Sequence, residues 1–155
     1  MVKRSTMIAG MILSLVAVCV IGLIFGNALM DYEASHRYSE MIAVFLDPDG
    51  TQDAGVLETT VRKIGHLVEY ALLGGVVMIL ILYIKHRFQK SVLGYGLFLV
   101  LAVAVLDEYF QSYSDRTSST EDILLDFLGA LIGFFLVCLV VRIYRCFHNA
   151  KRKKE

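Results

Sequence analysis

Three residue types that mark other classes of protein are scarce or absent. The sequence contains no tryptophan, one proline and three cysteines. Cys19, Cys138 and Cys146 lie within or beside apolar runs and lack the spacing of a metal site, so we expect packing residues and no disulfide framework. Acidic and basic residues number 15 each, so the net charge gives no reason to expect a nucleic-acid partner.

Apolar residues dominate instead. They make up 57% of the chain and form runs at residues 7–29, 64–84, 91–106 and 123–141. A membrane-spanning helix needs about 20 apolar residues at a rise of about 1.5 Å each. Each run approaches this length, which predicts a small multi-pass membrane protein.

The first run must be distinguished from a cleaved signal peptide. The hydrophobic region of such a peptide is usually about 7 to 15 residues long, whereas the run from Met7 to Phe25 is unbroken. We therefore expect a retained helix. The predicted fold is all-α, with a single domain over residues 1–155. This domain is a bundle of four transmembrane helices at about 7–29, 64–84, 91–111 and 122–141. Residues 30–62 form an external loop.

Basic residues are distributed unevenly between the ends of these helices. With the amino terminus in the cytoplasm, 11 of the 15 lie on the cytoplasmic side: Lys3, Arg4, Lys85, Arg87, Lys90, Arg142, Arg145, Lys151, Arg152, Lys153 and Lys154. The other four are Arg37, Arg62, Lys63 and Arg116. The positive-inside rule therefore favours cytoplasmic termini, with the polar helix ends open to the outside.

The external loop carries a helical pattern of its own. Apolar residues recur at helical spacing, opposite a face of Arg37, Ser39, Glu40 and Ala43; they are Tyr38, Met41, Ile42, Phe45 and Leu46. This pattern predicts a short interfacial helix lying on the outer leaflet. A turn at residues 47–50 ends it, and Asp53 is a candidate cap for the next helix.

Polar groups cluster at one end of three of the predicted spans. The second span begins with Lys63, His66, Glu69 and Tyr70 on one stripe, the third ends with Asp107, Glu108 and Gln111, and the fourth begins with Asp122 and Asp126. Charges inside spans are costly, so we expect these groups to meet inside the bundle. Gly129 and Gly133, four residues apart, predict a close approach of the fourth helix to a neighbour.

At these residues the chain resembles the VanZ-like membrane proteins. The segment 62–74, with a basic residue followed by His66, Tyr70 and Leu73-Gly74, resembles the first family signature. Asp107 to Gln111, then Arg116, Asp122 and Gly129 to Gly133, resemble the second. The resemblance implies a four-helix protein of a bacterial cell membrane, and it associates the chain with low-level resistance to teicoplanin, a glycopeptide antibiotic, without supplying a reaction. The chain departs from the family pattern in having Ser114-Asp115 where Pro-Gly is common and Asp126 where Asn is frequent.

Two functional hypotheses follow from the polar cluster. In the first, the protein is an enzyme acting on a lipid-linked envelope component at the outer leaflet, with catalytic residues His66, Glu69, Asp107 and Glu108 and substrate-binding residues Lys63, Tyr70, Gln111, Arg116, Asp122 and Asp126. No Ser or Cys nucleophile motif accompanies them, which limits the chemistry to acid–base or metal-assisted steps. In the second, the protein binds a membrane lipid, an envelope lipid or a glycopeptide antibiotic without catalysis.

A divalent metal and a purely structural role also remain open. His66 and Glu69 lie three residues apart on one helix, and carboxylates approach from two others, which suits a divalent cation. A single histidine leaves the metal signature incomplete, so the cofactor stays undetermined. Polar side chains also fix helix register in membrane bundles, which would make the cluster structural. The oligomeric state is not determined by the sequence.

Overall fold

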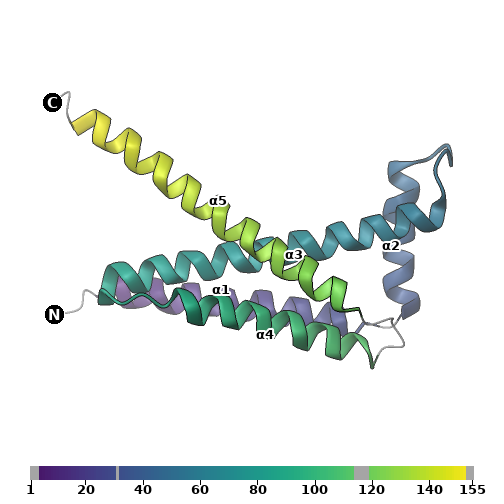
Figure 1. Cartoon of the computed structure of the whole chain (residues 1–155), viewed down its shortest axis with the longest axis horizontal. Helices are drawn as coiled ribbons and strands as arrows, with labels where there is room; N and C mark the ends of the chain where they lie inside the picture. Colours follow the sequence, from purple (N-terminus) through teal and green to yellow (C-terminus); the bar gives the residue numbers. More distant parts are fainter. Residues whose placement is uncertain (1–3, 31, 114–118, 153–155) are drawn as a thin grey trace.

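A computed structural model describes residues 4–30, 32–113 and 119–152 and contains five helices over these ranges. They are α1 (Arg4–Ala28), α2 (Tyr32–Leu46), α3 (Ala54–Phe88), α4 (Leu93–Gln111) and α5 (Thr120–Arg152) (Figure 1). The predicted all-α class is confirmed. Four of the helices, α1, α3, α4 and α5, are long and apolar enough to cross a membrane.

The four long helices run back and forth, and the two ends of the chain lie at the same end of the bundle (Figure 1). α3 has 35 residues and is therefore about 50 Å long, more than the roughly 30 Å of a hydrocarbon core. It begins ten residues before the predicted span at 64, so the predicted loop 30–62 contains the first turns of α3 as well as α2. α5 likewise continues past 141 to Arg152.

Local sequence signals explain both ends of α3. Asp53 caps the amino end, where its side chain accepts hydrogen bonds from the backbone N–H groups of Gly55 (2.9 Å) and Val56 (3.2 Å). At the carboxyl end, Gln89 has a left-handed backbone (φ 56°) and donates its N–H to the Lys85 carbonyl at 3.0 Å. The cap expected at Asp53 is confirmed.

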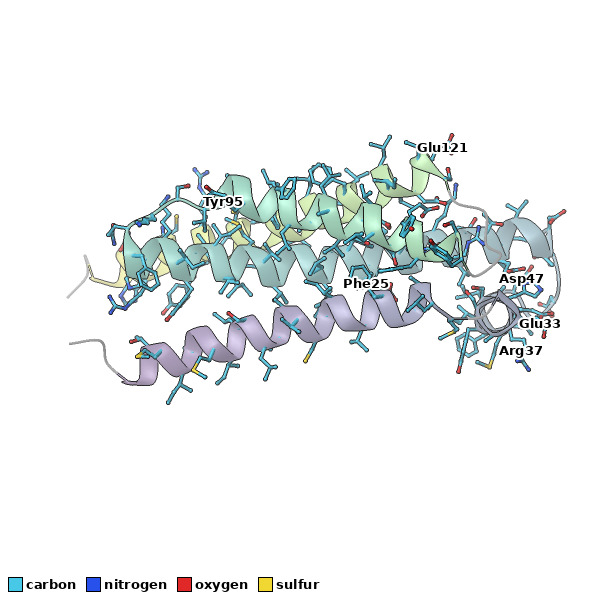
Figure 2. The ribbon with its side chains drawn as sticks, turned by 90° about the horizontal axis from the view of Figure 1, so that it is seen from below. Phe25, Glu33, Arg37, Asp47, Tyr95 and Glu121 are labelled. Atoms are coloured by element: carbon cyan, nitrogen blue, oxygen red, sulfur yellow. The ribbon has the colours of Figure 1, made fainter. Side chains whose placement is uncertain are left out.

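α2 lies crosswise to the long helices and packs on α3 (Figure 1). Its apolar residues are exposed, with Phe45 82% accessible, as an interfacial helix requires. Figure 2 looks along α2 and shows Glu33 and Arg37 on its side away from the bundle. On the opposite face, Arg37 and Glu40 are exposed, whereas Ser39 and Ala43 are buried. Both are small, which lets α2 approach α3 closely.

The turn after α2 is organised by Asp47. Its carboxylate accepts hydrogen bonds from the Gln52 backbone N–H (2.7 Å) and the Thr51 hydroxyl (3.0 Å). These donors, led by the Gln52 N–H, lower the pKa of Asp47. Gly50 adopts a positive φ of 63°, which completes the predicted turn at residues 47–50. An ion pair between His36 and Glu58 also joins α2 to α3.

α3 and α5 cross at their backbones. A Cβ atom at Gly133 would lie 2.0 Å from the Ala71 carbonyl oxygen, and one at Gly74 would lie 2.2 Å from that of Ala130. Gly129 is similarly close to Leu67. Only glycine permits this approach, so the predicted role of Gly129 and Gly133 is confirmed. The crossing fixes how α5 presents Asp126, which lies one turn before Gly129.

Candidate functional site

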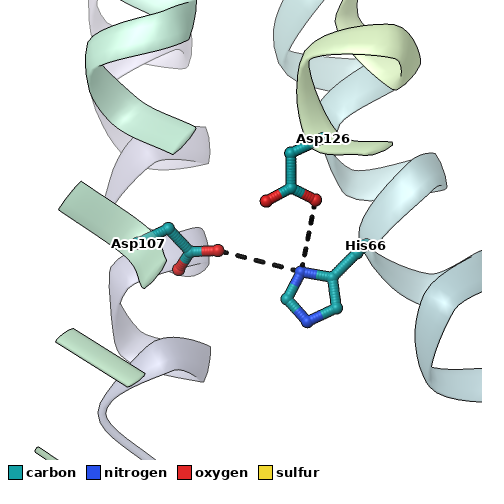
Figure 3. A group of neighbouring side chains, drawn as sticks. All are labelled: His66, Asp107 and Asp126. Carbon is teal, nitrogen blue, oxygen red and sulfur yellow. Dashed lines mark ion pairs between the residues drawn. The ribbon is translucent and has the colours of Figure 1, made fainter. Parts of the chain in front are cut away.

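Three helices bring His66, Asp107 and Asp126 together, and we call these residues the His–Asp cluster. The His66 Nδ1 atom on α3 lies 3.5 Å from Asp126 Oδ1 on α5 and 3.7 Å from Asp107 Oδ2 on α4 (Figure 3). One nitrogen and two carboxylate oxygens from these residues all lie within 4.8 Å of one another. The predicted meeting of polar groups from three spans is therefore seen for these three side chains.

The cluster is almost completely shielded. The side chain of His66 is 12% exposed, that of Asp107 2% and that of Asp126 0%. Within the part of the chain that the structure describes, neither Asp126 oxygen has a hydrogen-bond partner, and Asp107 Oδ1 has none. His66 lies within ion-pair distance of both carboxylates, but one imidazolium balances only one of their two charges, and the remaining charge is costly in a low-dielectric site.

Two neighbours support the cluster from within the helices. Gln111 lies one turn beyond Asp107 and donates its amide to Asp107 Oδ2 at 3.1 Å. Tyr70 lies one turn beyond His66, and its side chain is fully buried close to Asp107. Helical spacing explains both placements, because residues four apart share a face. Tyr70 and Gln111, predicted as substrate contacts, thus lie around the aspartates.

Glu69 belongs to a different part of the site. Its carboxylate accepts hydrogen bonds from the Asn27 side-chain amide on α1, at 3.1 and 3.4 Å. The sequence left a divalent metal at His66 and Glu69 open; the structure groups His66 with the two aspartates, and Glu69 is hydrogen-bonded to α1. Sequence reasoning missed Asn27, although a carboxamide at the end of an otherwise apolar run was the available signal.

The remaining predicted residues are spread around the cluster. Glu108 is buried and accepts a hydrogen bond from the Ser119 backbone N–H, so it joins the end of α4 to the start of α5. Asp122 is half-buried and interacts electrostatically with Asp126. Lys63 is exposed on α3 and makes no ion pair with a described residue. Arg116 lies outside the described residues.

A cleft of about 360 Å³, the lateral cleft, leads to His66 and Glu69 from between α1, α2 and α3. Tyr38 and Ile42 contribute apolar surface from α2, and Arg62 contributes a cation from α3. The other lining residues are Asn27, Met30, Ser35, Ser39, Val61 and Gly65. Of the described residues that we predicted as catalytic or substrate-binding, only His66 and Glu69 line the lateral cleft. Its basic residue is Arg62, whereas the prediction was Lys63.

A second groove of about 440 Å³, the tail groove, lies beside the lateral cleft along α1. The two share three lining residues, Asn27, Met30 and Glu69. Gly22 and Gly26 line the tail groove and have open space where a side chain would project. Its other lining residues are apolar: Val20, Leu23, Ile24 and Leu72. A cleft with polar walls thus lies next to an apolar groove.

Comparison with known proteins identifies one family. A sequence model described as VanZ/LLP1 matches residues 12–142, which is most of the chain. The match confirms the resemblance seen in the two motifs and extends it to include α1 and α2. No curated protein and no solved structure matches the chain.

Proposed function

Because this chain belongs to the VanZ/LLP1 family of membrane proteins, we propose that it binds one amphiphile of the cell envelope, headgroup in the lateral cleft and hydrocarbon tail in the tail groove. The observation that carries the proposal is that the two cavities are neighbours and share Asn27, Met30 and Glu69 in their walls. A small-molecule site is typically about 300–1,000 Å³ and mostly apolar with a few polar groups. Together the cavities meet that description.

The headgroup we propose is anionic. Arg62 provides a guanidinium in the wall of the lateral cleft, and a guanidinium binds phosphate or carboxylate through two parallel hydrogen bonds. The Asn27 amide donates a hydrogen bond to Glu69 and holds this carboxylate against α1. The amide is uncharged, so it does not neutralise the carboxylate. A phosphate ester or a carboxylate would therefore bind toward Arg62.

The proposed tail site faces the lipid. Leu23 and Leu72 are largely exposed, so a hydrocarbon chain can enter the tail groove sideways from the bilayer. Gly22 and Gly26 lie four residues apart, on one face of α1, and their missing side chains leave the space that a chain would fill. The groove thus suits a chain lying parallel to α1.

We place this site at the outer leaflet, with both termini in the cytoplasm. Basic residues near the carboxyl end and at the α3–α4 connection support this orientation. The exposed apolar side chains of α2 would then lie in the outer interface, next to the lateral cleft. An envelope lipid and the acyl tail of a lipoglycopeptide such as teicoplanin share the required chemistry.

Filling the tail groove tests the proposal. Gly26→Leu adds a side chain to the groove in open space, so the fold should tolerate it. The matched control is Gly94→Leu, which also projects into open space but lies on α4, away from both cavities. Phosphatidylglycerol and teicoplanin serve as separate probes in detergent micelles, with native mass spectrometry as the readout.

Wild-type protein and Gly94→Leu should retain bound phosphatidylglycerol, and Gly26→Leu should lose most of it. Arg62→Gln should weaken phosphatidylglycerol more than phosphatidylcholine, whose headgroup carries no net charge. Binding of teicoplanin but not phosphatidylglycerol would assign the site to the antibiotic. Equal retention by Gly26→Leu and Gly94→Leu would contradict the proposal.

A further inference from the structure

The spacing of the His–Asp cluster matches that of ligands around one small metal ion. Zinc binds histidine nitrogen and carboxylate oxygen at about 2.0–2.2 Å, so two ligands at a tetrahedral angle lie about 3.3–3.6 Å apart. The His66 Nδ1 atom lies 3.5 Å from Asp126 Oδ1 and 3.7 Å from Asp107 Oδ2. One donor atom from each of the three side chains lies within 4.8 Å of the other two, so small side-chain rotations would complete the geometry.

The charges of the cluster also call for a cation. Two carboxylates carry two negative charges, and a neutral imidazole adds none, so one divalent ion would balance them. No lysine or arginine within the described ranges forms an ion pair with Asp107 or Asp126. Both oxygens of Asp126, at 0% exposure, lack a hydrogen-bond partner there, and they point into the cluster (Figure 3). A fully buried carboxylate without a hydrogen-bond partner is expected to bind a metal ion or to lose its charge by protonation.

The surroundings of the aspartates resemble the outer shell of a metal site. Gln111 donates to Asp107 Oδ2 and so orients this carboxylate, while Oδ1 has no hydrogen-bond partner among the described residues. Outer hydrogen bonds of this kind fix metal ligands and tune their affinity. The Tyr70 hydroxyl is buried beside the same carboxylates and can donate to one of them or to a metal-bound water.

We propose that His66, Asp107 and Asp126 bind one Zn²⁺ ion, which keeps its fourth position open toward the lateral cleft. His66 is the one member that lines the cleft, so the open position would face the proposed headgroup. Three protein ligands with an open fourth position are typical of catalytic rather than structural zinc. Binding of the Zn²⁺ ion does not depend on the proposed function. A contact between the ion and an oxygen atom of the headgroup does rest on the proposed function.

The test uses the full chain, purified in detergent with a tag that lacks histidine and treated with a chelator. Zn²⁺ is then added back, and bound metal is counted by mass spectrometry after gel filtration. Wild-type protein should bind one Zn²⁺ per chain and unfold at a higher temperature with Zn²⁺ than without it. Asp126→Asn and His66→Gln should lose the stoichiometric ion and the thermal shift.

Matched controls exclude surface binding. Glu121→Gln changes an exposed carboxylate in the first turn of α5, and His86→Gln is exposed at the end of α3; both should keep one Zn²⁺ per chain. If the cluster variants do not fold, Co²⁺ in wild-type protein decides the question, because a tetrahedral site gives intense visible absorption. No stoichiometric metal and no such absorption would overturn the inference.

The outcomes separate this inference from the proposed function. Wild-type protein that retains phosphatidylglycerol but binds no Zn²⁺ would overturn the metal site alone. Protein that binds Zn²⁺ while Gly26→Leu and Gly94→Leu retain phosphatidylglycerol equally would overturn the amphiphile site alone. Equal Zn²⁺ content in Asp126→Asn and Glu121→Gln would place the metal elsewhere and contradict the assignment.

Discussion

Asn27 on α1 donates its side-chain amide to Glu69 on α3, at 3.1 Å from one carboxylate oxygen and 3.4 Å from the other. This contact joins the first helix to the polar end of the bundle and forms the boundary between the lateral cleft and the tail groove. Glu69 therefore has its hydrogen-bond partner on α1, whereas Asp107 and Asp126 face His66, so substitution of Glu69 and of the two aspartates should have different effects.

We expect Asn27→Ala to lower the free energy of unfolding by about 1 kcal/mol, because Glu69 loses a half-buried donor. Unfolding in mixed micelles measures this change. The control Asn149→Ala removes an exposed carboxamide near the end of α5 and should have no effect. In combination with Glu69→Gln, the two losses should be less than additive; full additivity would show that the side chains are not coupled.

Gly133→Ala should destabilise the protein even though alanine is the better helix former. Intrinsic propensity alone predicts a gain of about 1 kcal/mol. The added Cβ would instead lie 2.0 Å from the Ala71 carbonyl oxygen, so α3 and α5 must separate, at a cost of about 1–3 kcal/mol. Gly94→Ala, in open space, should be neutral or stabilising. We expect the change in the free energy of unfolding relative to wild type to have opposite signs in the two variants. A stabilised Gly133→Ala variant would contradict the close crossing.

His66→Ala, Asp107→Asn and Asp126→Asn should act as one unit. Residues that share a site lose function non-additively. If the proposed site binds teicoplanin and protects producing cells, each single variant and the triple variant should therefore raise their teicoplanin susceptibility to the same extent. Membrane abundance is measured in parallel by immunoblot. If abundance falls in proportion to resistance, the cluster is structural and the proposed site is wrong. Glu69→Gln should have its own, separate effect.

Gln111→Leu should weaken Zn²⁺ binding while leaving the three proposed ligands in place. Removing an outer hydrogen bond to a ligand typically costs about 10–100-fold in metal affinity, and Gln111 donates such a bond to Asp107. Competition with a chromogenic chelator measures the affinity. Gln52→Leu changes an exposed glutamine in the α2–α3 turn and should bind Zn²⁺ as wild type does.

The orientation is tested by cysteine labelling in intact cells. The three native cysteines are exposed and must first be replaced by alanine. An impermeant reagent should then label a cysteine at Asp49, in the α2–α3 turn, and should miss one at Arg87, at the end of α3. Lysed cells provide the control in which both are labelled. Labelling of Arg87→Cys alone in intact cells would reverse the orientation.

The sequence alone determined the elements of this protein. Apolar runs of membrane-spanning length predicted α1, α3, α4 and α5, because a hydrocarbon core sets both the length and the polarity of a spanning helix. Local chemistry predicted the cap at Asp53 and the turn at residues 47–50. Helical spacing placed Asp107 and Gln111 on one face, and they are hydrogen-bonded.

Only the tertiary structure decided which polar groups meet. Periodicity gives the face of each helix on which a residue lies, but it leaves open how far neighbouring helices are rotated and shifted against one another. The glycine crossing of α3 and α5 sets that relation and brings Asp126 to His66. The packing of α1 gives Glu69 a partner in Asn27 instead. A pairing between helices depends on backbone approach distances of a few ångströms, and these arise from the packed bundle as a whole.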